Sequence, residues 1–194
     1  MSKIAIELQN QLQKNIDAHK ELLNLSKNIV EVIQIIQKKL KKGGKLLLCG
    51  NGGSAADAQH LAAEFIVRLR PHINRNPIQA ITLAQDTSTL TACGNDYSFD
   101  DIFLRPFKAL AKKEDILICI STSGNSKNIL KVLKEAKKKK IYYVSFLGNG
   151  GGKAKKISNK HLIVSSSNTA RIQECHIFLG HFILEKVEDI LLAK

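Results

Sequence analysis

Apolar residues follow two different spacings along this chain, and the change from one to the other predicts its elements. Over residues 4–40 the spacing is that of a helix, in a stripe formed by Ile4, Leu8, Leu12, Ile16, Ile29, Val32, Ile33, Ile36 and Leu40. A weak break near Leu25 and Ser26 divides this stretch into two helices, and Gly43-Gly44 ends the second. Their apolar faces are expected to cover a sheet or to pack between subunits.

Beyond residue 44, short apolar runs alternate with helical patterns. The predicted strands are about 45–49, 79–83, 115–120, 141–147 and 161–164. The predicted helices include about 54–69, one that ends near 138, and 169–192. Between the second and third strands we expect short helical segments interrupted by a loop at 93–96, with a kink or restart at Pro106. This alternation favours an α/β fold with a parallel sheet, in which ligands bind beyond the carboxyl ends of the strands.

Length and termini predict one domain over residues 1–194, in which residues 1–43 form a helical extension. The first residues, MSKIAIELQNQ, lack the apolar block of a signal peptide, and no run approaches the roughly 18 apolar residues of a membrane helix. We therefore expect a cytoplasmic protein that does not bind a membrane. The widely spaced cysteines are expected to be reduced thiols packed as small apolar residues, at Cys49, Cys93, Cys119 and Cys175.

The net charge of +13 raises the question of nucleic-acid binding. Most of the excess is lysine, in runs such as Lys137 to Lys140 at predicted helix ends, where it complements the helix dipole. Base recognition and stacking use arginine and aromatic side chains, and the chain has only five arginines and no zinc-finger, RNA-recognition or helix-turn-helix signature. We therefore predict that the lysines lie on solvated surfaces and that the protein has no nucleic-acid partner. The positive field would still attract small anionic substrates.

The segment CGNGGSAADAQHLAAE, Cys49 to Glu64, joins a predicted strand to a glycine turn and a helix. The glycines allow backbone N–H groups to approach a ligand, and the unpaired N–H groups of a helix that begins near Ser54 point the same way. His60 and Glu64, four residues apart, share one face of that helix. The segment therefore predicts an anion site at the helix start and proton or metal chemistry one to two turns further along.

Two nucleotide-binding motifs resemble this turn in part. Gly50, Gly52 and Ala55 fit G-x-G-x-x-A, a weak form of the dinucleotide fingerprint. That fingerprint expects a ribose-binding acid about 20 residues further on, whereas Asp86 comes 31 residues after Ala55. No Gly-Lys-Ser/Thr follows, so the turn is not a P-loop either.

A second loop, Ser121 to Ser126 (STSGNS), lies between a predicted strand and a helix, and its hydroxyls suit a phosphate. The alternative is an ordinary loop in which Ser126 caps the helix. The two loops support each other, because both are expected at the same edge of the sheet.

The last predicted helix is apolar on nearly every side and should be buried in the domain or between subunits. On it, Gln173 and His181 are eight residues apart, or about 80° around the axis, and could reach one cavity. His176 is expected to be a satisfied core histidine.

Taken together, GNGGSAADAQHLAAE, the GND at Gly94 to Asp96, STSGNS, and Arg171-Ile172-Gln173-Glu174 with His176 and His181 closely resemble the sugar isomerase (SIS) family over nearly the whole chain. The resemblance implies a three-layer α/β sandwich with a five-stranded parallel sheet of the flavodoxin-like type plus N-terminal helices. It also implies a homotetramer with sites near subunit boundaries.

The resemblance implies site residues as well. Substrate contacts to a sugar phosphate fall at Asn51, Gly52, Gly53, Ser54, Glu64, Asn95, Asp96, Ser121, Thr122, Ser123, Ser126 and Gln173. Zinc ligands fall at His60, Glu64, Gln173 and His181. Glu64 and His181 also fill the proton-transfer roles.

Within the family, the match implies an aldose–ketose isomerase that converts sedoheptulose 7-phosphate to D-glycero-D-manno-heptose 7-phosphate for a surface glycan. The alternative is a non-catalytic protein of the same fold that binds a sugar phosphate or the bacterial replication initiator. That relative lacks counterparts of Glu64 and His181, and both are present here. The sequence therefore favours the enzyme.

Overall fold

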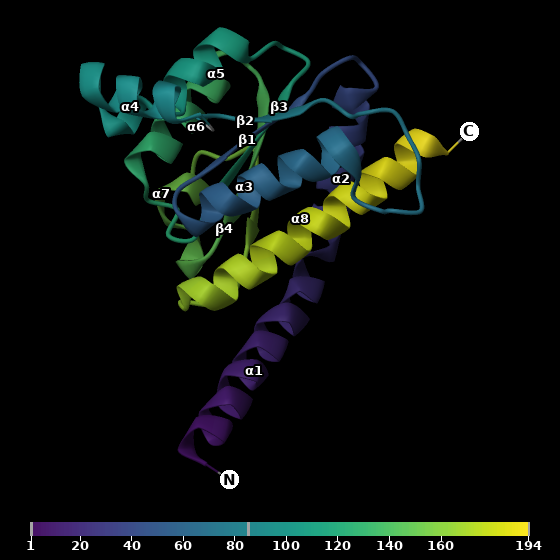
Figure 1. Cartoon of the computed structure of the whole chain (residues 1–194), viewed down its shortest axis with the longest axis vertical. Coiled ribbons are helices and arrows are strands. Elements are labelled where there is room, and N and C mark those ends of the chain that lie inside the picture. Colours follow the sequence, from purple (N-terminus) through teal and green to yellow (C-terminus); the bar gives the residue numbers. More distant parts are fainter. Residues whose placement is uncertain (1, 85, 194) are drawn as a thin grey trace.

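A five-stranded sheet forms the centre of the protein in the computed structural model, which describes residues 2–84 and 86–193 (Figure 1). Its strands are β1 (Leu46–Gly50), β2 (Ala80–Thr82), β3 (Ile116–Ser121), β4 (Tyr142–Leu147) and β5 (Lys160–Ile163). All neighbours pair in parallel in the order β2-β1-β3-β4-β5. This is the flavodoxin-like strand order, so the predicted fold class is confirmed.

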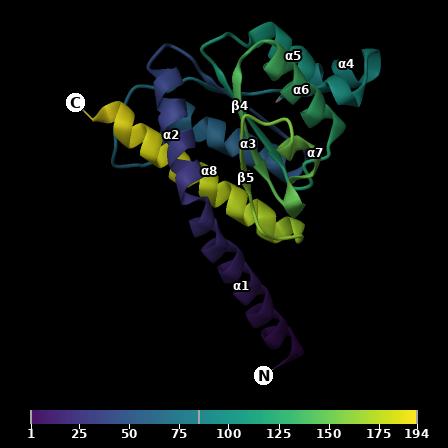
Figure 2. The same ribbon diagram turned by 180° about the vertical axis from the view of Figure 1, so that it is seen from behind.

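Helices cover both faces of the sheet, as Figures 1 and 2 show from opposite sides. One layer consists of η1 (Leu22–Leu25), α2 (Ser26–Leu40), α3 (Gly53–Ala63), η2 (Glu64–Arg68) and α8 (Thr169–Leu192), and the end of α1 (Lys3–Glu21) packs against it. The other consists of α4 (Thr87–Asp96), η3 (Phe99–Asp101), α5 (Leu104–Leu110), α6 (Lys127–Lys138), η4 (Asn149–Gly151) and α7 (Gly152–Lys155).

Successive side chains of the central strands enter different cores. In β1, Leu46 and Leu48 pack with the first helical layer, whereas Leu47 and Cys49 pack with the second. Because side chains alternate across a strand, a sheet covered on both faces needs apolar residues at every position. This explains the continuous apolar runs of the predicted strands.

The N-terminal helices behave differently from each other. The weak break predicted near Leu25 is a 3₁₀ turn, η1, and α2 beyond it packs against α8 and β5. In both views α1 extends away from the body of the protein. Its apolar stripe of Ile4, Leu8, Leu12 and Ile16 is exposed in the single chain.

The prediction of a loop at residues 93–96 is wrong, because these residues form the last turn of α4. The side chain of Asp86 accepts a hydrogen bond of 2.7 Å from the Thr89 backbone N–H and so caps the start of this helix. The helix then runs through Gly94 to Asp96. Pro106 lies in the first turn of α5, where its missing N–H costs nothing, so the predicted restart is confirmed.

The helix predicted at about 54–69 is continuous, but its hydrogen-bond register changes. It is α-helical as α3 over Gly53–Ala63 and π-helical as η2 over Glu64–Arg68. Short π-helical turns are rare and are frequent at functional sites. The change begins at Glu64, which the sequence analysis singles out.

The cysteines and the apolarity of the helices agree with the fold of the sheet and its two helical layers. All four cysteines are free and buried, as expected, with the Sγ atoms of Cys49 and Cys119 3.4 Å apart on adjacent strands. No helix in residues 2–84 and 86–193 combines the length and the apolarity needed to cross a membrane.

Candidate active site

The glycine turn lies between the end of β1 and the start of α3. Gly52 has a φ of +57° and occupies the N-cap position of α3, a backbone conformation that suits glycine. At Gly53 a Cβ atom would lie only 2.5 Å from Nε2 of Gln173, so the amide of this α8 residue rests directly against the turn. The structure thus brings Gln173 next to the predicted phosphate loop.

The second predicted loop follows β3, the strand next to β1, so both turns open at the same carboxyl edge of the sheet. Its conformation depends on Gly124, which has a φ of +63° and whose Cβ would lie 2.1 Å from the Gly151 carbonyl oxygen. Within the loop, Oγ of the buried Ser121 accepts a hydrogen bond of 3.1 Å from the Gly124 N–H. Ser126 occupies the N-cap position of α6 without a side-chain capping bond.

A residue that the sequence analysis missed connects these two loops. Asn128, only 2% exposed, exchanges amide hydrogen bonds of 3.0 and 2.9 Å with Asn51. Oδ1 of Asn128 also accepts a bond of 2.9 Å from the Ile129 N–H. Its position could have been noticed in the sequence, because Asn128 precedes Val132 and Ala136 at four-residue spacing. It is therefore a polar residue on the apolar stripe of α6.

Three candidate side chains from two helices converge at one point. Ligand atoms of His60, Glu64 and His181 all lie within 4.8 Å of one another. Nε2 of His60 is 2.8 Å from Nε2 of His181 and 3.3 Å from Oε1 of Glu64. Ligands about 2.0–2.1 Å from a tetrahedral zinc ion are about 3.3 Å apart, and the separations of His60 from His181 and from Glu64 lie close to that value. This donor set therefore suits such an ion.

Gln173, the fourth predicted ligand, lies eight residues before His181 on α8, which is about 12 Å along a helix. Since its amide packs against Gly53, it borders the glycine turn in this structure. Its role as a ligand stays a prediction.

Burial and charge lower the pKa of His181. The largest cause is desolvation, and the nearby His60 lowers the pKa further, whereas Glu64 raises it. Near neutral pH this imidazole is therefore neutral and can donate one N–H. On α3, burial raises the pKa of Asp57, a carboxyl group three residues before His60 that the sequence analysis did not single out.

Asn95 and Asp96 lie apart from the cluster. They are exposed in the last turn of α4, where the Asn95 amide donates a bond of 2.8 Å to Asp96. Helix α4 belongs to the second helical layer and α8 to the first, and both views separate them. A single chain in this conformation does not bring these two residues to His181.

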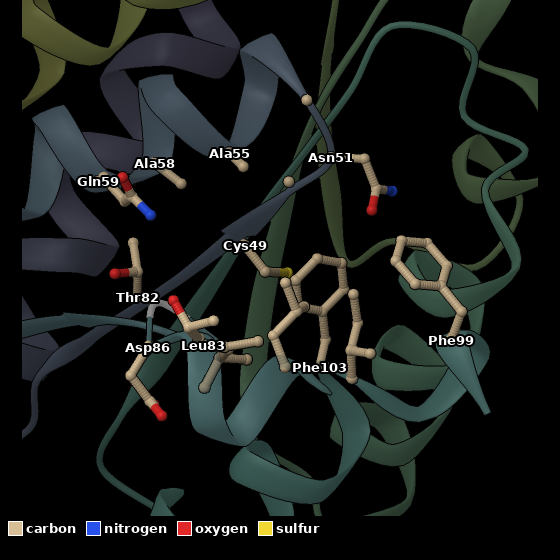
Figure 3. A pocket seen from close by; sticks show the side chains of 16 residues that line it. Cys49, Asn51, Ala55, Ala58, Gln59, Thr82, Leu83, Asp86, Phe99 and Phe103 are labelled. Carbon is tan, nitrogen blue, oxygen red and sulfur yellow. The ribbon is translucent and has the colours of Figure 1, made fainter. Parts of the chain in front are cut away.

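A cavity of about 220 Å³ opens beside the glycine turn, between α3, the end of β2, α4 and η3 (Figure 3). Asn51 and Gly52 contribute to its lining, and its floor is apolar, with Cys49, Leu83 and Phe103. His60, Glu64 and His181 do not line it. They lie on a more open surface, where the His60 side chain is 50% exposed.

His176 is a core group and not a member of the cluster, as expected. It is fully buried on α8, with Nε2 3.1 Å from the Leu147 carbonyl oxygen. Desolvation lowers its pKa to about 4. It stays neutral at any ordinary working pH.

The fold and the two-helix cluster define a class, the sugar isomerases of the SIS type. Residues 10–148 match the SIS domain family, which is well over half of the chain. The chain belongs to this family, and its relatives place it among the phosphoheptose isomerases.

These relatives cover nearly all of the chain. A phosphoheptose isomerase of Campylobacter concisus is 47% identical over 182 residues, 94% of this chain and 95% of the relative. The solved phosphoheptose isomerase of Neisseria gonorrhoeae has a TM-score of 0.90 at 36% identity and covers 96% of this chain and 100% of that one. The enzyme of Francisella tularensis has a TM-score of 0.91 at 33% identity, with 97% and 100% covered.

Burial of His176 predicts acid sensitivity of the fold. Between pH 6.5 and about 4 the unfolded chain binds a proton at this residue and the folded chain does not, so the free energy of unfolding falls as pH falls. One such proton is worth about 1.4 kcal/mol per pH unit. Urea unfolding between pH 7 and 4.5 should show a shallower fall in His176→Gln, which keeps an N–H donor. Other titrating groups are common to both proteins, so equal slopes would contradict the prediction.

Proposed function

We propose that this protein is an aldose–ketose isomerase that interconverts sedoheptulose 7-phosphate and D-glycero-D-manno-heptose 7-phosphate, for heptose in a surface glycan. The observation that carries the proposal is the convergence of His60, Glu64 and His181 in a chain 47% identical to a phosphoheptose isomerase. We further propose one SIS domain over residues 1–194, located in the cytoplasm, with 1–43 as its helical extension.

The substrate phosphate is assigned to the two loops at the carboxyl edge of the sheet. The proposed contacts come from Asn51 to Ser54, Ser121 to Ser123, Ser126 and Gln173. The start of α3 supports this assignment because helix N-termini and glycine turns bind anions. Asn95 and Asp96 complete the proposed set, and their distance from α8 requires either a second copy of the chain or a movement of α4.

Isomerisation moves a proton between adjacent carbons through an enediol, which needs a base at carbon and an acid at oxygen. Glu64 is the proposed base. His181 is the proposed acid, and its lowered pKa supports a neutral imidazole that donates an N–H to the substrate oxygen. Phosphate held by the loops fixes the reacting carbons relative to both groups.

Zinc is the proposed cofactor, with His60, Glu64, Gln173 and His181 as its residues. When bound, the ion polarises the substrate oxygen. A metal-bound carboxylate is a weaker base, so either Glu64 would share or leave the ion during turnover, or the ion would mainly polarise the substrate oxygen and fix the geometry. The presence of Glu64 and His181 in one cluster favours this enzyme over a non-catalytic protein of the same fold.

A second copy of the chain is the proposed occupant of the exposed apolar surface, in a homotetramer. The stripe of Ile4, Leu8, Leu12 and Ile16 on α1 and the rings of Phe178 and Phe182 on α8 are exposed in one chain. His181 lies between these two phenylalanines in sequence, on the same helix. A copy that covers this surface would also shield the open cluster from water.

Isotope exchange tests the reaction and the proposed base together. Wild-type protein should convert sedoheptulose 7-phosphate to the aldose and exchange the abstracted hydrogen with solvent. Glu64→Gln should stop both exchange and turnover, with a loss in kcat of about 10²–10⁴. His181→Ala should lose product formation to a similar degree while slow exchange continues.

Deuterium-labelled substrate followed by NMR measures both quantities, and circular dichroism confirms that each variant is folded. Undiminished exchange in Glu64→Gln would move the base to another residue, with His181 the first to examine. No aldose from the wild-type protein would contradict the proposed function.

Metal content tests the zinc site. Protein purified without chelator should contain up to one zinc per chain, and His60→Ala should lose most of it because only two of the three clustered donors remain. His72→Ala is the control, since His72 is exposed and lies outside the cluster. Equal zinc in wild type and His60→Ala would remove His60 from the site.

Light scattering tests the assembly. Wild-type protein at micromolar concentration should have the mass of four chains, and Leu8→Glu with Leu12→Glu should reduce it, because charge on the apolar stripe opposes its burial. Asn10→Glu is the matched control on the same helix, about 200° from Leu8. A monomeric wild type would refute the proposed tetramer.

A further inference from the structure

Arg75, in the irregular segment between η2 and β2, has a buried side chain that is only 1% exposed. Figure 1 shows this segment passing the C-terminal half of α8. The guanidinium donates from Nη2 to the Glu64 carbonyl oxygen at 2.8 Å and from Nη1 to the Phe65 carbonyl oxygen at 2.9 Å. Arg75 therefore holds the backbone of the residue that supplies the clustered carboxylate.

The same guanidinium is held from the other side by Glu188 of α8. Nε of Arg75 donates to Oε1 of Glu188, a carboxylate that is fully buried. Nη1 also donates to the Asn76 carbonyl oxygen at 3.1 Å. Four acceptor atoms surround the planar guanidinium, so its hydrogen bonds fix both its position and its orientation.

Glu188 lies seven residues after His181, so it is two turns further along α8 on nearly the same face. Arg75 thus connects the backbone at Glu64 with the helix that carries His181. The connection is made where α3 changes to the π-helical η2.

Stability alone is a poor explanation for this arrangement. A buried ion pair loses much of its attraction to desolvation, and apolar residues of similar size often replace it without loss of stability. What apolar residues cannot replace is a set of donors directed at two backbone carbonyl groups.

We propose that Arg75 is a positioning residue that, through Glu188, sets the location of the Glu64 carboxylate relative to His181. This inference rests on the proposed isomerase function and deepens it. Arg75 touches neither substrate nor metal in this assignment, and it acts through its bonds to the backbone of Glu64 and Phe65 and to Glu188.

Arg70 provides a matched control. It also pairs with Glu188, through Nε at 2.8 Å, and with Asp189 at 2.6 Å. Its remaining ion-pair partner is Glu185, at 3.8 Å. Arg70 thus shares the carboxylate of Glu188, but the contacts of its guanidinium are with acidic side chains of α8.

The test compares Arg75→Met, Arg75→Met with Glu188→Leu, and Arg70→Met against wild type. Arg75→Met should lower kcat by about 10–100-fold, the range typical of groups that orient ligands, with little change in KM because the phosphate loops are elsewhere. Its affinity for zinc alone, measured by competition with a chromophoric chelator, should fall by a similar factor. Arg70→Met should keep both values near wild type.

The double variant separates positioning from stability. The apolar Met–Leu pair should recover the part of the urea midpoint that Arg75→Met loses by leaving the buried Glu188 carboxylate without Arg75. The backbone carbonyl groups still lack their donor, so kcat and zinc affinity should stay low. Wild-type kcat and zinc affinity in the double variant would overturn the proposal, as would equal losses in Arg70→Met and Arg75→Met. An inactive wild type would contradict the isomerase function, whereas the zinc affinities of the four proteins would still decide the role of Arg75.

Discussion

The close contact between α3 and α8 is the constraint on which the rest of the site depends. Gly180 makes this contact possible, because a Cβ atom there would lie 2.5 Å from a methyl carbon of the buried Leu61. His181 follows Gly180 on α8, and His60 precedes Leu61 on α3. Their Nε2 atoms are 2.8 Å apart. A larger side chain at Gly180 would separate the helices and, with them, the nitrogen atoms that form the cluster.

Two kinds of support surround this contact. At the carboxyl edge of the sheet, the reciprocal amide pair of Asn51 and Asn128 joins the glycine turn to the start of α6. At the other end of α3, Arg75 and Glu188 join η2 to α8. Each pair includes a buried side chain, Asn128 or Glu188, that is hydrogen-bonded to its partner, so each connects elements far apart in sequence. The proposed anion site and the proposed proton-transfer groups thus lie at different parts of one set of connected elements.

In a single chain the cluster of His60, Glu64 and His181 is open to solvent. His60 is half exposed, and Phe178 and Phe182 on α8 contribute apolar surface to the same helix as His181. The cavity beside the glycine turn is separate from the cluster and has a volume of about 220 Å³, below the range of roughly 300–1,000 Å³ usual for ligand pockets. Proton transfer at carbon benefits from exclusion of water, and the proposed tetramer would supply surface that covers the cluster.

Local patterns were sufficient to predict the elements and much of the candidate site. Apolar runs of four to seven residues between helical stripes predicted five parallel strands, and the four-residue spacing of His60 and Glu64 placed both on one helical face. Spacing acts within an element, so it can be read from the chain. The same logic failed at residues 93–96, where Gly94 suggested a loop but α4 continues through it to Asp96.

Contacts between distant segments were decided only by the tertiary structure. Nothing in the spacing of Asn51 and Asn128, or of Arg75 and Glu188, pairs them across 77 and 113 residues. The π-helical register at Glu64 and the location of Asn95 and Asp96 away from α8 are likewise absent from the pattern. The sequence by itself determined where the five strands and most of the helices lie and which of their faces are apolar. Packing of those faces determined which polar groups meet, because a side-chain pair forms only after the helices that carry it have been fixed against the sheet.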